Sequence, residues 1–209
     1  WEDDFNSLNT ELWNVDIGDG CPELCGWGNS ELQSYQNNNV YVEEIPGEEG
    51  NFALVLEAKK EKTGNSAFTS GKVTTKNKLG IKYGMVEFRI KVANDQSKGL
   101  WPAAWLLGTN IDAVNWPYCG EIDMMEMGHG TQFRNEQELP NTNENTLIGG
   151  NLIFYSDDAC SNDNQDCAAS IAFDKWYNEP YTSKTTLTDR FMIYRMYWDD
   201  NEIRLTMED

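Results

Sequence analysis

The segment EIDMME, residues 121–126, places three carboxylates within six residues of one another. If this segment is a β-strand, its side chains alternate, so Glu121 and Asp123 share a face and Met125 would be next on it. A β-bulge absorbs one extra residue and would return Glu126 to the face of the other two acids. Bulges of this kind are frequent beside active sites. We therefore predict a bulged strand whose three carboxylates project into one cleft.

Carboxylates at this spacing suit the cleavage of a glycosidic bond with retention of configuration. One carboxylate attacks the anomeric carbon, while a second donates a proton to the leaving oxygen and later activates water. Asp123 can hydrogen-bond the nucleophile and separate the two pKa values. The alternative is a helix with three surface acids, but a helix would spread Glu121 and Glu126 around its axis. Gly120 and Gly128 also bound a segment that is poor for a helix.

The composition limits the class of protein and of partner. A chain of 209 residues is long enough for one domain with a sizeable core. Its net charge of -19 would repel phosphates, which argues against nucleic acid and anionic membranes as partners. There is no apolar run near the length that crosses a bilayer, so we expect no membrane insertion. The chain opens at once with WEDDFNSLNTELW and shows no signal peptide, so we expect it to be a mature or a trimmed chain.

Short apolar runs alternate with turn residues along the chain, and no long helical pattern stands out. This pattern is typical of an all-β sandwich or barrel. The predicted strands cover residues 39–43, 52–60, 70–76, 83–92, 100–108, 121–126, 145–155, 191–198 and 203–208. In the segment 83–92, one face is predicted to carry Val86, Phe88, Ile90 and Val92, and the other Met85, Glu87, Arg89 and Lys91.

The chain has five cysteines, an odd number. Cys21 and Cys25 lie close together, as do Cys160 and Cys167, so each pair can form a local disulfide in an oxidising compartment. Cys119 is left over, and we predict a buried free thiol. The spacings do not form the two matching halves of a zinc site. We expect a secreted, cell-surface or periplasmic protein.

Four blocks of sequence resemble glycoside hydrolase family 16, and within it the laminarinase-like endo-β-1,3-glucanases. These blocks are GEIDMMEM, GLWPAAWLLG, WGNSELQSYQNNNVYVE and FTSGKVTTKNKLGIKYGMVEFRIKV. The resemblance covers almost the whole chain. It implies a β-jelly-roll of two curved antiparallel sheets with a substrate cleft along the concave sheet, forming a single catalytic domain over residues 1–209. Members of the family continue through further strands, so we expect the natural domain to extend beyond Asp209.

The resemblance also implies roles for the carboxylates. Glu121 is the expected nucleophile, Asp123 the helper and Glu126 the acid/base, and no cofactor takes part in catalysis. The implied substrate is a β-glucan polysaccharide, and the protein is expected to be a monomer. A structural calcium is implied on the convex side, with oxygen ligands from Glu2 and the carbonyl of Gly50.

Six residues are implied as substrate ligands: Asn29, Arg89, Trp101, Trp105, Trp116 and Asn151. A guanidinium can donate to sugar hydroxyls, and an indole offers a flat apolar face to a sugar ring. The alternative for each tryptophan is core packing. Family members usually carry a histidine on the strand after the catalytic one, and His129 cannot fill that position. Asn151 would replace it as hydrogen-bond partner, with Phe154 or Tyr155 as a stacking surface.

Other activities fit the same residues. A lichenase-type enzyme would cut mixed β-1,3/1,4-glucan, but that group typically has the motif without the extra methionine. Another polysaccharide of marine origin, such as agar or carrageenan, is a further alternative, although a sulfated chain would call for a basic cleft. A non-catalytic glucan-binding module has no use for three intact carboxylates. A transglycosylase would transfer sugar to an acceptor other than water, and the sequence does not separate it from a hydrolase.

Overall fold

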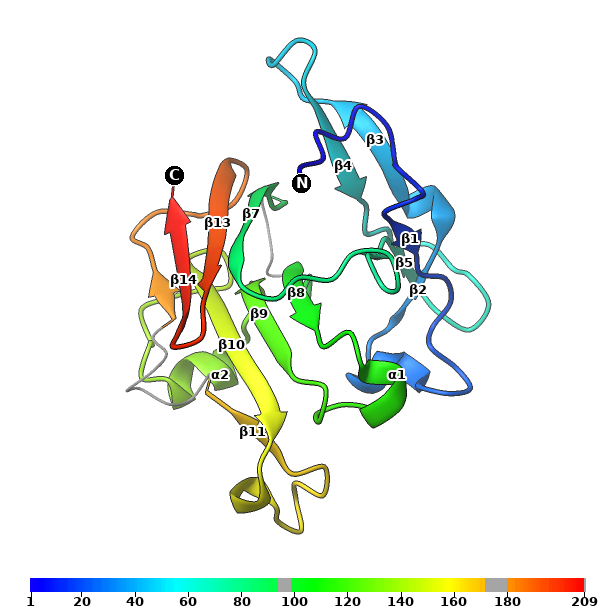
Figure 1. The fold of residues 1–209 in the computed structure, drawn as a ribbon. Coiled ribbons are helices and arrows are strands. Elements are labelled where there is room, and N and C mark those ends of the chain that lie inside the picture. The colour runs from blue at the N-terminus through cyan, green and yellow to red at the C-terminus, as the bar shows by residue number, and fades with distance from the viewer. Residues whose placement is uncertain (94–98, 172–179, 209) are drawn as a thin grey trace. The chain divides into compact units, whose positions relative to one another are not determined.

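A computed structural model of the chain describes residues 1–93, 99–171 and 180–208 (Figure 1). The described residues form fourteen β-strands and only two α-helices, each of six residues or fewer. They divide into two compact units, residues 1–80 and 81–209, and each unit is described by itself. The single domain over residues 1–209 stays a prediction. Among the described residues, no helix is long and apolar enough to cross a membrane.

The N-terminal unit contains three two-stranded pairs. Strand β1 (Asn14–Val15) pairs antiparallel with β6 (Val73–Thr74), β2 (Gln33–Tyr35) pairs parallel with β5 (Phe68–Ser70), and β3 (Val40–Glu44) pairs antiparallel with β4 (Phe52–Leu56). Two short 3-10 helices, η1 (Cys25–Gly28) and η2 (Asn37–Asn39), precede β2 and β3.

The strand predicted over residues 70–76 is two strands, because the chain changes partner at Gly71. Strand β5 ends at Ser70 and β6 begins at Val73. An added Cβ at Gly71 would lie 2.5 Å from the carbonyl oxygen of Asn39, so only glycine allows the backbones to approach so closely here.

The C-terminal unit contains the remaining strands in two sheets (Figure 1). In the first sheet the order is β11 (Ala168–Ser170), β10 (Leu147–Tyr155), β9 (Glu121–Glu126) and β8 (Ala103–Leu107), and β12 (Tyr181–Thr182) pairs with the start of β10. In the second sheet the order is β14 (Ile203–Glu208), β13 (Phe191–Trp198) and β7 (Gly84–Lys91). The helices of this unit are α1 (Ile111–Val114), α2 (Thr131–Glu136) and the 3-10 helix η3 (Asp157–Ala159).

The predicted alternation along β7 is confirmed. Val86, Phe88 and Ile90 are partly buried, whereas the residues between them are exposed. Strand β7 pairs along its whole length with β13, so its apolar face joins the same core as Met192 and Tyr194 of β13.

The core of the C-terminal unit is one cluster of buried apolar side chains: Val92, Met125, Met127, Ile148, Leu187, Met192 and Tyr194. Members come from both sheets, because β9 and β10 belong to the first sheet and β13 to the second. Burying one large apolar side chain contributes about 1.5–3 kcal/mol. The cluster therefore anchors β9 from one face and leaves its other face to polar side chains.

The segment predicted as a strand over residues 100–108 begins later than expected. Strand β8 starts at Ala103, directly after Pro102. Proline has no N–H to donate to a neighbouring strand, which explains the later start. Trp101 therefore lies outside β8, although the predicted strand included it.

Candidate active site

The predicted β-bulge in β9 is confirmed by the pairing on both of its sides. Toward β8, Met125 faces Ala104 and Asp123 faces Trp105, so Met124 is the extra residue of β9. Toward β10, the register also shifts by one residue, between Gly149 and Asn151. The pairings of β9 with β8 and with β10 thus shift around the same extra residue of β9.

The bulge divides β9 into a core side and a carboxylate side. Met124 and Met125 are 5% and 1% exposed, and Met125 belongs to the core cluster. Asp123 is 4% exposed, and Glu121 and Glu126 are partly buried. The methionines thus hold the strand in place while the acids remain available to each other.

The three carboxylates interact with one another, which confirms that they share one face. Asp123 has a side-chain hydrogen bond with Glu121. Burial raises the pKa of the Asp123 carboxyl well above its usual value, and the charges of Glu126 and Glu121 raise it further. Burial also raises the pKa of Glu126, and the charge of Glu121 adds to that rise. Their catalytic roles stay predictions at this point.

Two tryptophans hold the outer two carboxylates. The indole Nε1 of Trp101 donates to Oε1 of Glu126 at 2.8 Å, and that of Trp116 donates to Oε2 of Glu121 at 2.7 Å. The bond from Trp101 lowers the pKa of Glu126, against the larger effect of burial. Both indoles remain 40% exposed or more, so their ring faces are open to a ligand.

Trp105 and Asn151 face the middle carboxylate from the two neighbouring strands. Each is the direct cross-strand partner of Asp123, on β8 and β10 respectively. Cross-strand partners lie on the same face of a sheet, so both residues share the face of the carboxylates. Asn151 is buried, and its Oδ1 accepts a hydrogen bond of 2.9 Å from the hydroxyl of Ser170.

Two of the predicted ligands have other contacts in the structure. The guanidinium of Arg89 lies over the ring of Phe191, 3.9 Å from its centroid. Asn29 belongs to the N-terminal unit, where its Nδ2 lies 3.5 Å from Oε1 of Glu31. For both residues, contact with the substrate stays a prediction.

One residue beside the carboxylates was not predicted to act there. His129, three residues after Glu126, has a hydrogen bond with the backbone of Glu126 and stacks on Phe133. Its Nε2 is buried and has no hydrogen-bond partner among the described residues, so Nδ1 makes the bond. An added Cβ at Gly149 would lie 2.5 Å from this Nε2. In the sequence, the three-residue separation between Glu126 and His129 is the feature that could have predicted this contact.

A small open pocket of about 260 Å³ lies on the Glu126 side of the three carboxylates. It is lined by Gly99, Leu100, Trp101, Met127, Gly128 and His129. The pocket is therefore formed mainly by apolar side chains, next to the tryptophan that contacts Glu126.

The predicted calcium ligands are not part of a metal-binding group. Within residues 1–93, 99–171 and 180–208, no group of three or more His, Cys, Asp or Glu side chains is placed to hold a metal ion. The backbone N–H of Gly50 donates to Oε1 of Glu44, and Glu2 is exposed. The calcium site at Glu2 and Gly50 therefore stays a prediction.

The two predicted disulfides and the free thiol are confirmed, but the prediction that Cys119 is buried is wrong. Cys21 is bonded to Cys25 and Cys160 to Cys167, and Cys119 is a free thiol. The thiol is only partly buried, and burial raises its pKa. A raised pKa disfavours the reactive thiolate, which agrees with a structural residue.

Residues 29–152 match the family model described as "Glycosyl hydrolases family 16", and the match covers more than half of the chain. The chain belongs to glycosyl hydrolase family 16. The matched residues of this family 16 chain include strands β8 and β9 with all three carboxylates.

Two relatives of this family 16 chain carry names that specify a linkage. Glucan endo-1,3-beta-glucosidase A1 of Niallia circulans is 38% identical over 136 residues, which are 60% of this chain and 19% of the relative. Glucan endo-1,3-beta-glucosidase of Cryptopygus antarcticus is 38% identical over 132 residues, which are 60% of this chain and 44% of the relative. The match thus spans less than half the length of either relative.

A solved structure supports the fold of this family 16 chain. The laminarinase catalytic domain from Thermotoga maritima is similar with a TM-score of 0.73 and 28% identity, over 99% of this chain and 72% of that one. The predicted all-β jelly-roll class is therefore confirmed.

Proposed function

We propose that this protein is a retaining endo-β-1,3-glucanase that acts on laminarin-type β-glucan. The observation that carries the proposal is the interaction of Glu121, Asp123 and Glu126 on one face of a bulged strand. A carboxyl pair with different proton affinities is what double displacement at an anomeric carbon requires.

In the first step, a carboxylate oxygen of Glu121 attacks the anomeric carbon and forms a glycosyl ester. The bond from that carbon to the leaving oxygen breaks, and Glu126 gives its proton to this oxygen. The raised pKa of Glu126 supports this role, because it favours the protonated form that an acid catalyst needs. The N–H of Trp116 holds the Glu121 carboxylate in place for the attack.

In the second step, Glu126 removes a proton from a water molecule, and the water oxygen attacks the same carbon and releases Glu121. Two inversions give net retention. Asp123, which favours the protonated form, donates its hydrogen bond to Glu121 and so supports the carboxylate both as nucleophile and as leaving group. No cofactor is needed, since carboxyl groups and water supply every proton and bond.

The relatives support the choice of linkage. Both curated relatives are named as endo-1,3-beta-glucosidases, and the similar structure is a laminarinase. The bulged motif of this chain agrees with that group. Mixed-linkage β-1,3/1,4-glucan is the second candidate substrate.

A product profile tests the proposal. The protein is incubated with laminarin, lichenan and agarose, and the products are separated by chromatography. We expect short oligosaccharides from laminarin and, at early times, β-anomers by proton NMR. Initial release of α-anomers would exclude retention, and products from agarose alone would exclude the substrate class.

Substitution of Glu121 tests the mechanism. Glu121→Ser should lower the hydrolysis rate by roughly 10³-fold or more, because no nucleophile remains, while oligosaccharide binding persists. Glu136→Ser is the matched control, since Glu136 is an exposed acid of α2. A Glu121→Ser rate near that of the wild type would refute the nucleophile assignment.

We also infer that the protein works outside the cytosol, because its two local disulfides suit an oxidising compartment. The calcium site at Glu2 and Gly50 stays a prediction and has no part in the reaction. A rise in the melting temperature on addition of calcium chloride would support it.

A further inference from the structure

Two stacked tyrosines, Tyr118 and Tyr155, lie at the Glu121 end of the first sheet and have no part in the proposed mechanism. Their ring centroids are 4.1 Å apart and the ring planes differ by 14°. Tyr118 is 59% exposed, so the ring face turned away from Tyr155 is open to solvent. We call these two residues the tyrosine pair.

The strand register places the tyrosine pair on the face of the carboxylates. Glu121 faces Ile153 on β10, so Ile153 shares the face of Glu121. Tyr155 is two residues further along β10 and therefore on the same face, about 7 Å beyond the level of Glu121. Phe154 points to the opposite face.

The tyrosine pair continues a series of aromatic side chains along β9. Trp101 contacts the acid/base carboxyl, Trp105 faces Asp123, and Trp116 contacts Glu121. Tyr118 follows Trp116 by two residues. A polysaccharide that lies over the three carboxylates would therefore meet the tyrosine pair directly after Glu121.

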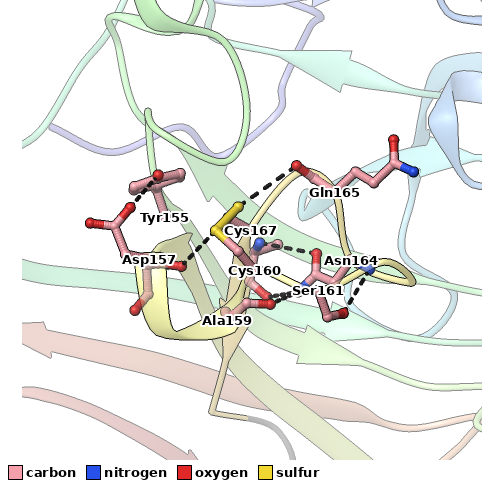
Figure 2. The surroundings of a disulfide bond; sticks show 10 residues. Tyr155, Asp157, Ala159, Cys160, Ser161, Asn164, Gln165 and Cys167 are labelled. Atoms are coloured by element: carbon pink, nitrogen blue, oxygen red, sulfur yellow. Dashed lines mark hydrogen bonds between the residues drawn. A yellow bond between two sulfur atoms is a disulfide. The ribbon is translucent and has the colours of Figure 1, made fainter.

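A closed loop holds the tyrosine pair in place. Figure 2 shows the hydroxyl of Tyr155 directed at Asp157, and the two oxygens are 2.6 Å apart. Tyr155 also has a side-chain hydrogen bond with Tyr118. Asp157 lies in the loop of residues 156–167, and the disulfide between Cys160 and Cys167 constrains this loop (Figure 2). A ring that is already fixed loses little conformational freedom when it binds a ligand.

We propose that the tyrosine pair is a sugar-binding platform on the Glu121 side of the reaction centre. The open face of Tyr118 stacks on the apolar face of a glucosyl unit of the β-glucan. Stacking on a flat ring suits a neutral sugar, which carries no charge that the acidic protein would repel. The proposal rests on the proposed function and adds a residue pair that selects for longer chains.

The test measures kcat/KM for laminari-oligosaccharides of increasing length. Tyr118→Ala should lower kcat/KM roughly 2- to 10-fold for chains long enough to reach the platform and leave the shortest cleaved chain unchanged. Tyr155→Ala should have the same effect, because it removes the support of the Tyr118 ring. Tyr118→Phe keeps the flat face and should resemble the wild type. If Tyr118→Ala does not fold, Tyr118→Leu, which fills the space without a flat face, replaces it.

The controls separate a platform from a structural role. Tyr181→Ala removes an exposed tyrosine at the other end of β10 and should show no length dependence. An equal loss for all chain lengths in Tyr118→Ala, or no loss at any length, would overturn the proposal. A length-dependent loss in Phe154→Ala but not in Tyr118→Ala would also overturn it.

The same variants distinguish failure of the platform from failure of the proposed function. If the wild type cleaves laminarin and Tyr118→Ala behaves like it, only the platform is refuted. If the wild type cleaves no β-glucan, the proposed function is refuted. The platform is then tested by comparing the affinities of the wild type and Tyr118→Ala for laminarihexaose. In that case, equal affinity of the wild type and Tyr118→Ala for laminarihexaose, or no binding at all, would exclude it, and a weaker affinity of Tyr118→Ala would support it.

Discussion

The hydrogen bond from Trp101 to Glu126 offers a direct test of how the pKa of the proposed acid/base carboxyl is set. Nε1 of Trp101 lies 2.8 Å from Oε1 of Glu126 and favours its charged form. Trp101→Phe keeps an aromatic ring but removes the N–H. Because burial then acts with less opposition, the pKa of Glu126 should rise further.

The size of the shift follows from the hydrogen bond that is lost. A hydrogen bond to a charged group contributes about 1.5–3 kcal/mol, and one pKa unit corresponds to about 1.4 kcal/mol. The full loss of such a bond would raise kcat/KM on the alkaline limb up to about a hundredfold relative to its maximum. Trp101 is 53% exposed, so water replaces part of the lost donor. We expect kcat/KM on this limb, relative to its maximum, to be roughly 3- to 10-fold higher than in the wild type.

The pH dependence of kcat/KM measures this shift. The acid catalyst must be protonated, so activity falls as the pH rises through the pKa of Glu126. The alkaline limb of the profile should therefore move to higher pH in Trp101→Phe. Trp116→Phe is the matched control, because it removes an indole N–H from Glu121 instead and should leave the alkaline limb in place.

Two results would contradict this account. An alkaline limb that does not move in Trp101→Phe would mean that Glu126 is not the group that limits activity at high pH. A limb that moves to lower pH would mean that the indole N–H favours the neutral carboxyl.

Two further changes test the strand and its support. Deleting Met124 removes the extra residue and restores plain alternation, so Glu126 stays on the face of the other two acids and activity should stay within roughly tenfold. Initial rates on laminarin measure this, and a loss of roughly 10³-fold or more in a variant that still folds would contradict the bulge. Gly149→Ala should displace the ring of His129 and cost about 1–3 kcal/mol of stability, while Gly130→Ala, with open space around its added Cβ, should not. Thermal unfolding measures both, and equal melting temperatures would contradict the close contact.

The sequence predicts those features that depend on local periodicity. Alternation predicted the face of β7, and one residue too many between Asp123 and Glu126 predicted the bulge. Both depend on the fixed two-residue period of a strand, which holds whatever lies next to it.

Features that depend on partners distant in the sequence were not predicted. The indole bonds to Glu121 and Glu126 depend on loop conformations, which the spacing of Trp101 and Trp116 does not reveal. The stacking of Tyr118 on Tyr155 joins two segments that only the strand register brings together.

Short strands at the sheet edge were missed for another reason. The sequence of β11 is AAS, which lacks the β-branched and aromatic residues that indicate a strand. It forms because β10 offers unpaired backbone groups along its outer edge, and three residues pair with them. Local preference contributes little to such a strand.

The proton that Asp123 retains in the folded protein links the site to resistance against alkali. Unfolding exposes this carboxyl to water and releases its proton, so folded molecules bind more protons than unfolded ones above its usual pKa. Stability from this group is complete in acid and is lost as the pH rises toward its raised pKa. The strand proposed to perform the chemistry is thus also one where rising pH weakens the fold.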